Sequence, residues 1–376
     1  MPTMSRASGV DRSGLKILLI ASIRFPLSEP FVGGLETHTW SLAQGLRERG
    51  HTVVVAAATG SDPAMVGYEF GSLPPADDRA DTSVSPAIRQ AEERAFTGLM
   101  DDLHSGLLGS FDLIHNNSLY PTPVAQAGTL PCPLVTTLHT PVLPWAPEVF
   151  RVDRHREVTF IAVSRATARS WSSLVPAVVV HNGVDPARWP AGPGGPCAVW
   201  SGRLVAEKAP HLAIDIARAA GMGLTLAGPI MDQTYFADQV APRLGGNIRY
   251  TGHLGSPELA RLVGASAVAL VTPTWAEPFG LVAVEAMCCG TPVLAFGRGG
   301  LLEVVTATTG RLLSPPRTAA ALDPGELAAA VTALAQTAAL DRAEVRRVAE
   351  ATWSLSRMVA RYEQVYDQAL ARSTWA

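Results

Sequence analysis

Short apolar runs alternate with longer amphipathic segments along most of the chain. A run at Lys16–Ala21 is followed by a segment with helical spacing at Glu36–Arg49, and then by another run at Thr52–Ala58. Apolar runs of this length predict buried strands, and the segments between them predict helices on the faces of a parallel sheet. Gly50 stands where the first of these helices is expected to stop.

The same alternation continues after a looser segment at Gly60–Ser85. Further strands are expected at Asp112–His115, Leu134–Leu138, Phe160–Val163, Ala177–His181, Cys197–Ser201, Leu224–Ala227, Ile248–Thr251, Val268–Val271 and Pro292–Phe296. Further helices are expected at Ala87–Leu108, Ala209–Ala220, Pro257–Ala265 and Leu281–Cys289, and from Pro324 onward. This order predicts an α/β protein built on parallel sheets.

A stretch rich in proline and glycine divides the chain, and a length of 376 residues exceeds that of one typical domain. We expect a linker at 189–196 between a domain at 14–188 and a domain at 197–353, after a disordered tail at 1–13. Doubly wound domains bind ligands at the carboxyl ends of their strands. Two facing halves therefore predict a ligand in the cleft between them.

The composition limits which kinds of binding partner and which cellular compartment we expect for the protein. A formal net charge of −3 argues against nucleic acid or an anionic membrane as the main partner, because both reward dense positive charge. Residues 1–13 lack the apolar core of a signal peptide, and the prolines of Ile114–Pro147 exclude a membrane helix there, so we expect a cytoplasmic protein. The cysteines lack metal-binding spacing and are expected to be reduced, buried thiols: Cys132, Cys197, Cys288 and Cys289.

Motifs of several other enzyme classes are missing from the sequence. There is no strict G-x-G-x-x-G, which disfavours a nicotinamide-dependent dehydrogenase, and no Gly-Lys pair that could belong to a P-loop. There is also no H-E-x-x-H and no Asp-x-Asp that could hold a metal–diphosphate unit. A metal-dependent reaction therefore gains no support.

The segment SGRLVAEK, Ser201–Lys208, lies between a predicted strand and a predicted helix. Arg203 offers a forked donor and Lys208 a point charge, and the following helix adds backbone N–H groups, which together suit a diphosphate. Only Lys16 and Lys208 among the 30 basic residues are lysines, so a lysine in this turn is unusual for the chain. The alternative is a pair of solvated basic residues on a loop.

A second candidate segment, EPFGLVAVE, carries two carboxylates at the carboxyl end of the Val268–Val271 strand. Pro278 and Gly280 keep Glu277 on the loop before the helix, whereas Glu285 lies within the helix. Carboxylates at this edge can accept hydrogen bonds from sugar or ribose hydroxyls, and the free N–H groups at the start of the helix can meet phosphate or sugar oxygens. The alternative is one acid at a helix N-terminus and one solvated acid on the helix.

Together these segments resemble the GT-B retaining glycosyltransferases of family GT4. Glu277 and Glu285 match the E-x7-E element of the family, and EPFGLVAVEAMCCGTPVLAFGRGGLLEVV is similar to its signature. SGRLVAEK resembles its diphosphate-binding turn, GGLETHTWSLAQGLRERGH its glycine loop and first helix, and HNGVD the end of its first domain. The resemblance covers roughly residues 15–370 and departs at Leu302, where the family usually has proline before the acid that is Glu303 here.

The resemblance implies two Rossmann-like domains facing across a cleft, with a C-terminal helix at 354–376 crossing back to the first domain. It also implies a retaining, metal-independent hexosyl transfer from a nucleoside-diphosphate sugar, most simply a UDP or GDP sugar, with no cofactor. Arg203 and Lys208 would neutralise the diphosphate, Glu285 would hold the ribose hydroxyls, and Glu277 the hydroxyls of the transferred sugar. The residues implied as catalytic are His139, Arg203, Lys208 and Glu277. The other implied donor contacts are Gly33, Gly34, Gly252, His253, Leu254, Phe279, Gly280, Leu281 and Glu285.

The acceptor is expected on the first half of the chain. Phe31, Tyr120 and Trp145 lie on predicted loops and could stack on a sugar, although aromatic residues in such positions more often belong to the core. No basic amphipathic helix points to a lipid acceptor, so we expect a soluble small molecule or glycan and a monomer or homodimer without an integral membrane segment. Two alternatives stay open: a sugar-nucleotide epimerase of the same fold, and a catalytically silent sugar-nucleotide-binding subunit.

Overall fold

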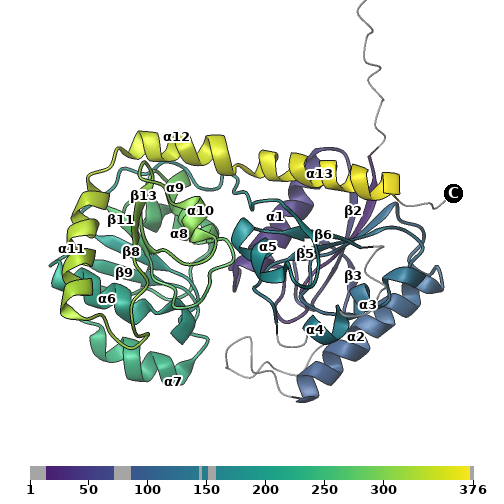
Figure 1. Ribbon diagram of the computed structural model, residues 1–376, viewed down its shortest axis with the longest axis horizontal. Coiled ribbons are helices and arrows are strands. Elements are labelled where there is room, and N and C mark those ends of the chain that lie inside the picture. Colours follow the sequence, from purple (N-terminus) through teal and green to yellow (C-terminus); the bar gives the residue numbers. More distant parts are fainter. Residues whose placement is uncertain (1–13, 72–85, 144–145, 151–157, 373–376) are drawn as a thin grey trace, which may run out of the picture.

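The computed structural model describes residues 14–71, 86–143, 146–150 and 158–372, so the expected tail at 1–13 lies outside the described residues. Two α/β domains lie side by side, and each is built on one parallel sheet (Figure 1). The central strands of both sheets are almost entirely buried, as expected where helices cover both faces. The predicted α/β class with two Rossmann-like domains is confirmed.

The first domain holds a seven-stranded sheet in the order β3-β2-β1-β4-β5-β6-β7. Its strands are β1 (Lys16–Ile20), β2 (Thr52–Ala57), β3 (Val66–Glu69), β4 (Leu113–Asn116), β5 (Leu134–Leu138), β6 (Val158–Ala162) and β7 (Ala177–Val179). Its helices are α1 (Gly34–Glu48), α2 (Pro86–His104), α3 (Thr122–Ala125), α4 (Ala146–Val149) and α5 (Arg165–Trp171).

The second domain holds a six-stranded sheet in the order β10-β9-β8-β11-β12-β13. Its strands are β8 (Ala198–Ser201), β9 (Leu224–Ala227), β10 (Ile248–Tyr250), β11 (Val268–Val271), β12 (Val293–Phe296) and β13 (Gly310–Leu313). Its helices are α6 (Pro210–Ala219), α7 (Gln233–Tyr235), α8 (Ser256–Gly264), α9 (Leu281–Cys288), α10 (Leu301–Val304) and α11 (Pro324–Ala338).

The differences from the predicted elements lie mainly at the edges of the sheets. Strand β3 falls in the segment expected to be loose, because its residues alternate between partly buried and exposed and its pairing with β2 shifts register. Strand β13 and helix α5 were also not predicted, since both are short. Cys197 is exposed, so the expectation of four buried thiols is wrong for it, because it precedes β8 rather than lying within it.

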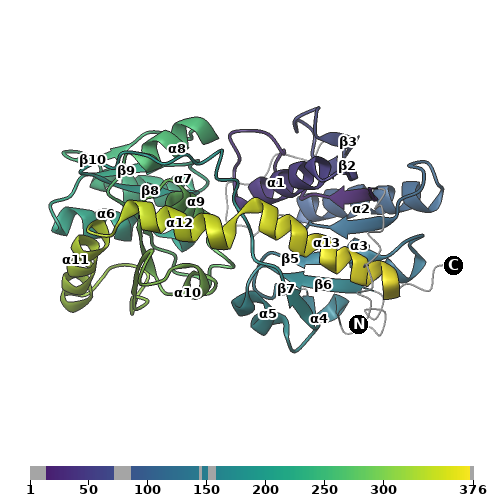
Figure 2. The ribbon, with the colours of Figure 1, turned by 90° about the horizontal axis from the view of Figure 1, so that it is seen from above.

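The last two helices join the domains from above. Helix α12 (Arg342–Trp353) packs on the second domain and α13 (Leu355–Arg372) on the first, and they run end to end along the molecule (Figure 2). At the point of crossing, the backbone of Val184 pairs with Trp353 and Leu355, with N···O distances of 2.8 and 2.9 Å. The two connections between the domains are therefore bonded to each other.

Helix α13 is also tied to the first domain by buried polar groups. The Tyr366 hydroxyl lies 2.8 Å from Nδ1 of His115, whose Nε2 lies 2.8 Å from the hydroxyl of Thr137. Tyr362 reaches Thr137 and His38, at 3.3 Å each. Burial lowers the pKa of His38 and of His115 to about 3, so both imidazoles are neutral. None of the described helices combines the length and apolar character that a membrane span needs.

The contact between α1 and α13 predicts a sharp effect of Gly45→Ala. A Cβ at Gly45 would lie 2.6 Å from Cγ2 of buried Val359, so one helix must shift. We expect a loss of about 1–3 kcal/mol in the free energy of unfolding, measured by denaturant titration.

Gly98→Ala in α2 is the matched control, because a Cβ there meets nothing within 4 Å. Helix propensity alone predicts that this variant gains about 0.5–1 kcal/mol. Equal effects of the two substitutions would contradict the packing of α13 on α1.

Candidate functional site

Lys208 and Glu277 form an ion pair at the carboxyl edge of the second sheet. Lys208 ends the turn η3 (Ala206–Lys208) that follows β8, and Glu277 lies on the loop between β11 and α9. Nζ of Lys208 is 2.7 Å from Oε2 of Glu277, and both side chains are half-buried, with 22% and 13% of their surface exposed. The structure thus brings together two of the predicted site residues that are separated by 69 positions.

Trp275 completes this group and was not predicted from the sequence. Its indole N–H donates to Oε2 of Glu277 at 2.9 Å, and Nζ of Lys208 lies 4.9 Å from the centre of its ring. The indole therefore holds the carboxylate and faces the cation at once. Its position two residues before Glu277 on the same loop is the sequence feature from which it could have been predicted.

Glycines give the Glu277 loop its shape. Gly280 is the N-cap of α9 with a φ of 98°, and a Cβ there would lie 2.5 Å from Cδ2 of Leu301. The backbone N–H of Gly300 donates to the carbonyl oxygen of Glu277 at 2.7 Å. Glycine is required where a left-handed conformation or so close an approach occurs. The N-terminus of α9, with the predicted Phe279 and Leu281, is held directly beside the ion pair.

Arg203 lies on the same turn as Lys208. Its Nη2 is 3.6 Å from Oε1 of Glu207, and the carbonyl oxygen of Glu207 accepts from the backbone of Thr274 at 2.8 Å. This backbone contact joins the turn after β8 to the loop after β11. Two cations after β8 and the Glu277 carboxylate after β11 are therefore collected at adjacent strand ends of one sheet.

Glu285 lies in α9 with only 7% of its surface exposed. Burial raises the pKa of its carboxyl group to about 7, and the nearby positive charge of Arg188 offsets part of that rise. Arg188 is in turn paired with Glu29 and lies 4.3 Å from the centre of the Trp40 ring, both in the first domain. The second predicted carboxylate is thus buried close to the boundary between the domains.

Two further predicted segments meet across this boundary. A Cβ at Gly34 would lie 3.3 Å from Cδ1 of Leu281, so the glycine turn before α1 abuts the start of α9. Nε2 of His253 lies 3.0 Å from the carbonyl oxygen of Phe31. The Gly33–Gly34 turn and the Gly252–Leu254 loop therefore both border the same region as Glu285, and their donor-binding roles stay predictions.

His139 lies at the end of β5, and its environment is buried and polar. Its Nε2 is 2.7 Å from Oδ1 of Asn117, and its ring meets the His38 ring edge-on with centroids 4.8 Å apart. Burial, with His38 and His115 nearby, holds the pKa of His139 well below its usual value. The ring is neutral and would serve as a hydrogen-bonding group rather than as a cation.

The predicted acceptor contacts differ in their surroundings. The Phe31 ring lies 5.9 Å from that of Trp40, whereas Tyr120 stacks on Phe96 with centroids 4.5 Å apart, so its face toward Phe96 is occupied. Trp145 lies outside the described residues. These acceptor roles stay predictions.

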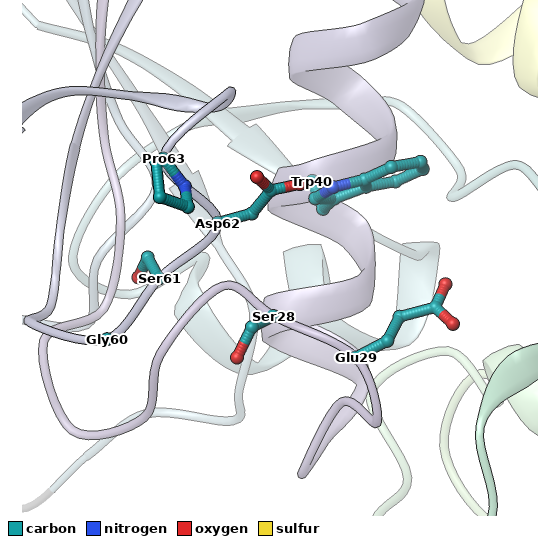
Figure 3. Close-up of a pocket in the computed structure, with 7 residues that line it drawn as sticks. All are labelled: Ser28, Glu29, Trp40, Gly60, Ser61, Asp62 and Pro63. Carbon is teal, nitrogen blue, oxygen red and sulfur yellow. The ribbon is translucent and has the colours of Figure 1, made fainter.

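A hollow of about 470 Å³ opens on the first domain, next to Trp40 (Figure 3). Its other lining residues are Ser28, Glu29, Gly60, Ser61, Asp62 and Pro63. Figure 3 shows Asp62 and Trp40 among the residues that line it. Within the described ranges there is no group of three or more His, Cys, Asp or Glu side chains that could hold a metal ion.

The two halves of the chain match two protein-family models. Residues 32–188 match "Glycosyltransferase Family 4", and residues 185–330 match "Glycosyl transferases group 1". "Glycogen synthase" of Mycobacterium tuberculosis is 29% identical over 360 residues, which cover 79% of this chain and 82% of the relative. "Phosphatidyl-myo-inositol mannosyltransferase" of Propionibacterium freudenreichii is 26% identical and covers 76% of this chain and 79% of its own length.

Solved structures share the fold at lower identity. AviGT4, described as a glycosyltransferase involved in avilamycin A biosynthesis, aligns with a TM-score of 0.69 and 24% identity over 96% of this chain and 99% of its own. HepE of Anabaena, solved in complex with UDP and glucose, aligns with a TM-score of 0.70 and 20% identity over 94% of this chain and 100% of its own. These likenesses establish the two-domain GT-B architecture.

The buried carboxyl group of Glu285 predicts a pH-dependent stability. Because its pKa is about 7 in the folded protein, above the usual 4.5, the folded state keeps a proton that the unfolded state loses between these values. The stabilisation present at low pH is lost as the pH rises through about 7, and amounts to roughly 3 kcal/mol.

Glu285→Gln should remove this dependence, because the amide does not ionise. Denaturant titrations across this pH range should show the variant gaining on the wild type as the pH rises. Glu258→Gln, on the exposed face of α8, is the control and should follow the wild type throughout. Parallel curves for Glu285→Gln and the wild type would contradict the burial of this carboxylate.

Proposed function

We propose that this chain, which belongs to the GT4 family of glycosyltransferases, moves a sugar from a nucleoside-diphosphate sugar to an acceptor hydroxyl with retention of configuration. The observation that carries the proposal is the group of Lys208, Arg203 and Glu277 at adjacent strand ends, beside the N-terminus of α9. Cations and free N–H groups suit a diphosphate, and a carboxylate between them suits the attached sugar.

The departure of the nucleoside diphosphate is the step that these residues would assist. Lys208 and Arg203 would neutralise the charge that develops on the leaving phosphate, and the first N–H groups of α9 would add to that effect. Glu285 would accept hydrogen bonds from the ribose hydroxyls. Glu277 would accept hydrogen bonds from the hydroxyls of the transferred sugar.

Retention is proposed to follow from attack on the same face as the leaving group. A retaining hydrolase of the usual kind needs a free carboxylate as nucleophile beside the anomeric carbon. One oxygen of Glu277 already holds both the Lys208 ammonium and the Trp275 N–H, which weakens it as a nucleophile. We therefore favour an oxocarbenium-like state in which the leaving phosphate oxygen helps to deprotonate the acceptor, with no metal ion and no cofactor.

For the base of the donor and for the acceptor, we propose only the chemical class. UDP or GDP is the expected nucleotide, and the fold is shared with HepE, a protein solved with UDP and glucose. The acceptor is proposed to be a soluble small molecule or glycan that approaches the first domain. The hollow beside Trp40, whose ring also contacts Phe31, offers an aromatic face for it.

A thermal-shift screen with UDP, GDP, ADP and dTDP and their sugar conjugates tests the donor site. A ligand that binds only the folded state at a hundredfold excess over its Kd stabilises it by about 2.7 kcal/mol. We expect one nucleotide to raise the Tm of the wild type and not that of Glu285→Ala. No shift with any nucleotide would contradict the proposed site, and donor turnover to a new sugar nucleotide without acceptor would identify an epimerase instead.

Substitution of the cations tests the proposed chemistry. Lys208→Ala and Arg203→Ala should each lower kcat by about 100-fold or more, because each removes a charge that stabilises the departing diphosphate. Both side chains are partly exposed, so folding should be retained in thermal unfolding.

Arg261→Ala is the matched control, since this arginine lies on α8 of the same domain with 74% of its side chain exposed. Its rate should equal that of the wild type. Full activity of purified Lys208→Ala and Arg203→Ala would refute the assignment.

A further inference from the structure

Asn117 holds the ring of His139 from the residue directly after β4. Oδ1 of Asn117 lies 2.7 Å from Nε2 of His139. A carboxamide oxygen carries no proton, so the imidazole must be the donor in this bond, and its proton is on Nε2. Nδ1 of His139 then keeps its lone pair and can only accept a hydrogen bond.

Thr39 fixes the orientation of the Asn117 amide. Nδ2 of Asn117 donates to Oγ1 of Thr39 at 2.8 Å, and the Thr39 hydroxyl donates to the carbonyl oxygen of Leu35 in α1, also at 2.8 Å. Asn117 and Thr39 are both 0% exposed. Because the Thr39 proton is directed to Leu35, its oxygen accepts, and the amide nitrogen rather than the amide oxygen must face it.

Nδ1 of His139 is the open end of this chain of donors. Among the described residues it has no hydrogen-bond partner, and His139 is 9% exposed while Asn117 is fully enclosed. His139 follows β5, and the neighbouring strand β6 leads to Arg165, whose backbone donates to Glu303 of the second domain at 3.0 Å. The open atom therefore lies at the edge of the first sheet that meets the second domain.

We propose that Asn117 is a positioning residue that, together with Thr39, fixes His139 as the tautomer protonated on Nε2 and so presents Nδ1 as a hydrogen-bond acceptor for a hydroxyl group of the bound ligand. An acceptor of this kind pairs with hydroxyl protons and offers nothing to the oxygens of a phosphate. His139 would therefore contact a hydroxyl group of the ligand, whereas Lys208 and Arg203 would contact its phosphates. That the hydroxyl belongs to a sugar or acceptor rests on the proposed function, whereas the tautomer does not.

Burial keeps His139 neutral, and the titratable groups that face it bring no charge that would reverse this. They are His38 from α1 and His115 from β4, and burial lowers the pKa of each to about 3. Tyr362 of α13 contacts His38 from the far side, and burial raises the pKa of its hydroxyl, so it too stays uncharged. The acceptor at Nδ1 is therefore available across the range in which an ordinary histidine titrates.

Long-range 1H–15N NMR on the 15N-histidine-labelled full chain tests the tautomer directly. His139→Gln removes one of nine histidine signals and assigns His139 in the wild type. The expected pattern has the proton on Nε2 and an unprotonated Nδ1, and Thr39→Val, which takes away the acceptor of the Asn117 amide, should disturb it. Thr39→Ser keeps the hydroxyl and should restore it. A proton on Nδ1 in the wild type, or an unchanged pattern in Thr39→Val, would overturn the proposal.

The pH profile of Asn117→Asp tests the consequence for activity. A carboxylate beside Nε2 favours the imidazolium and raises the pKa of His139. The protonated ring donates from Nδ1, so the kcat/KM of the variant relative to that of the wild type should fall about tenfold at the acidic end and recover as the pH rises. Taking this ratio cancels any limb due to Glu285, whose pKa of about 7 is common to both proteins.

Asn117→Asp and the wild type with the same profile would count against the positioning role. Loss of activity at every pH with an unchanged NMR tautomer in Asn117→Asp would do so as well. An inactive wild type that still shows the Nε2 proton would refute the proposed function and leave the tautomer assignment intact. The two failures are therefore separable.

Discussion

The close approach of two glycines to the backbone of Glu277 is the constraint on which the site depends. A Cβ at Gly299, where φ is 58°, would lie 2.1 Å from the Glu277 carbonyl oxygen, and the N–H of Gly300 donates to that oxygen at 2.7 Å. These backbone contacts position Glu277 independently of the partners of its carboxylate. Lys208 and Trp275 contact a carboxylate whose backbone is held by the loop. The same loop also holds the N-terminus of α9 in place.

Backbone groups also hold a carboxylate in place at the boundary between the domains. The carboxylate of Glu303 accepts from the N–H groups of Arg165 and Ala166 at the start of α5, at 3.0 and 2.8 Å, and contacts His181 at 3.0 Å. An acid at a helix N-terminus is favoured by the unpaired N–H groups there. The backbone of Val184 also pairs with Trp353 and Leu355 where the chain crosses into α13. The relative position of the domains is therefore held by directional hydrogen bonds, which also position the residues of the site at their boundary.

The sequence allowed the fold and part of the site to be predicted, for identifiable reasons. Central strands such as β1 are continuous apolar runs, whereas β3 and β13 lie at sheet edges, where half-buried residues blur the pattern. Lys208 and Glu277 could be predicted as site candidates because each lies in a compact local motif, and the structure brings the two together. The contacts of Asn117 with Thr39 and His139 span 78 and 22 positions, and only the order of strands β1, β4 and β5 brings them together. No local pattern marks such a residue.

The charged side chains of the candidate site are paired with one another, and this pairing bears on which ligand the site would recognise. Lys208 faces Glu277 and Arg203 faces Glu207. A diphosphate that draws Lys208 toward itself would leave the Glu277 carboxylate without its cation, and the sugar hydroxyls would then supply the lost hydrogen bonds. A nucleotide without its sugar would leave Glu277 uncompensated in a largely buried position, and a free sugar would have to displace Lys208 with no phosphate to receive it. With the roles proposed above, the ion pair would therefore favour the intact nucleotide sugar over either of its parts.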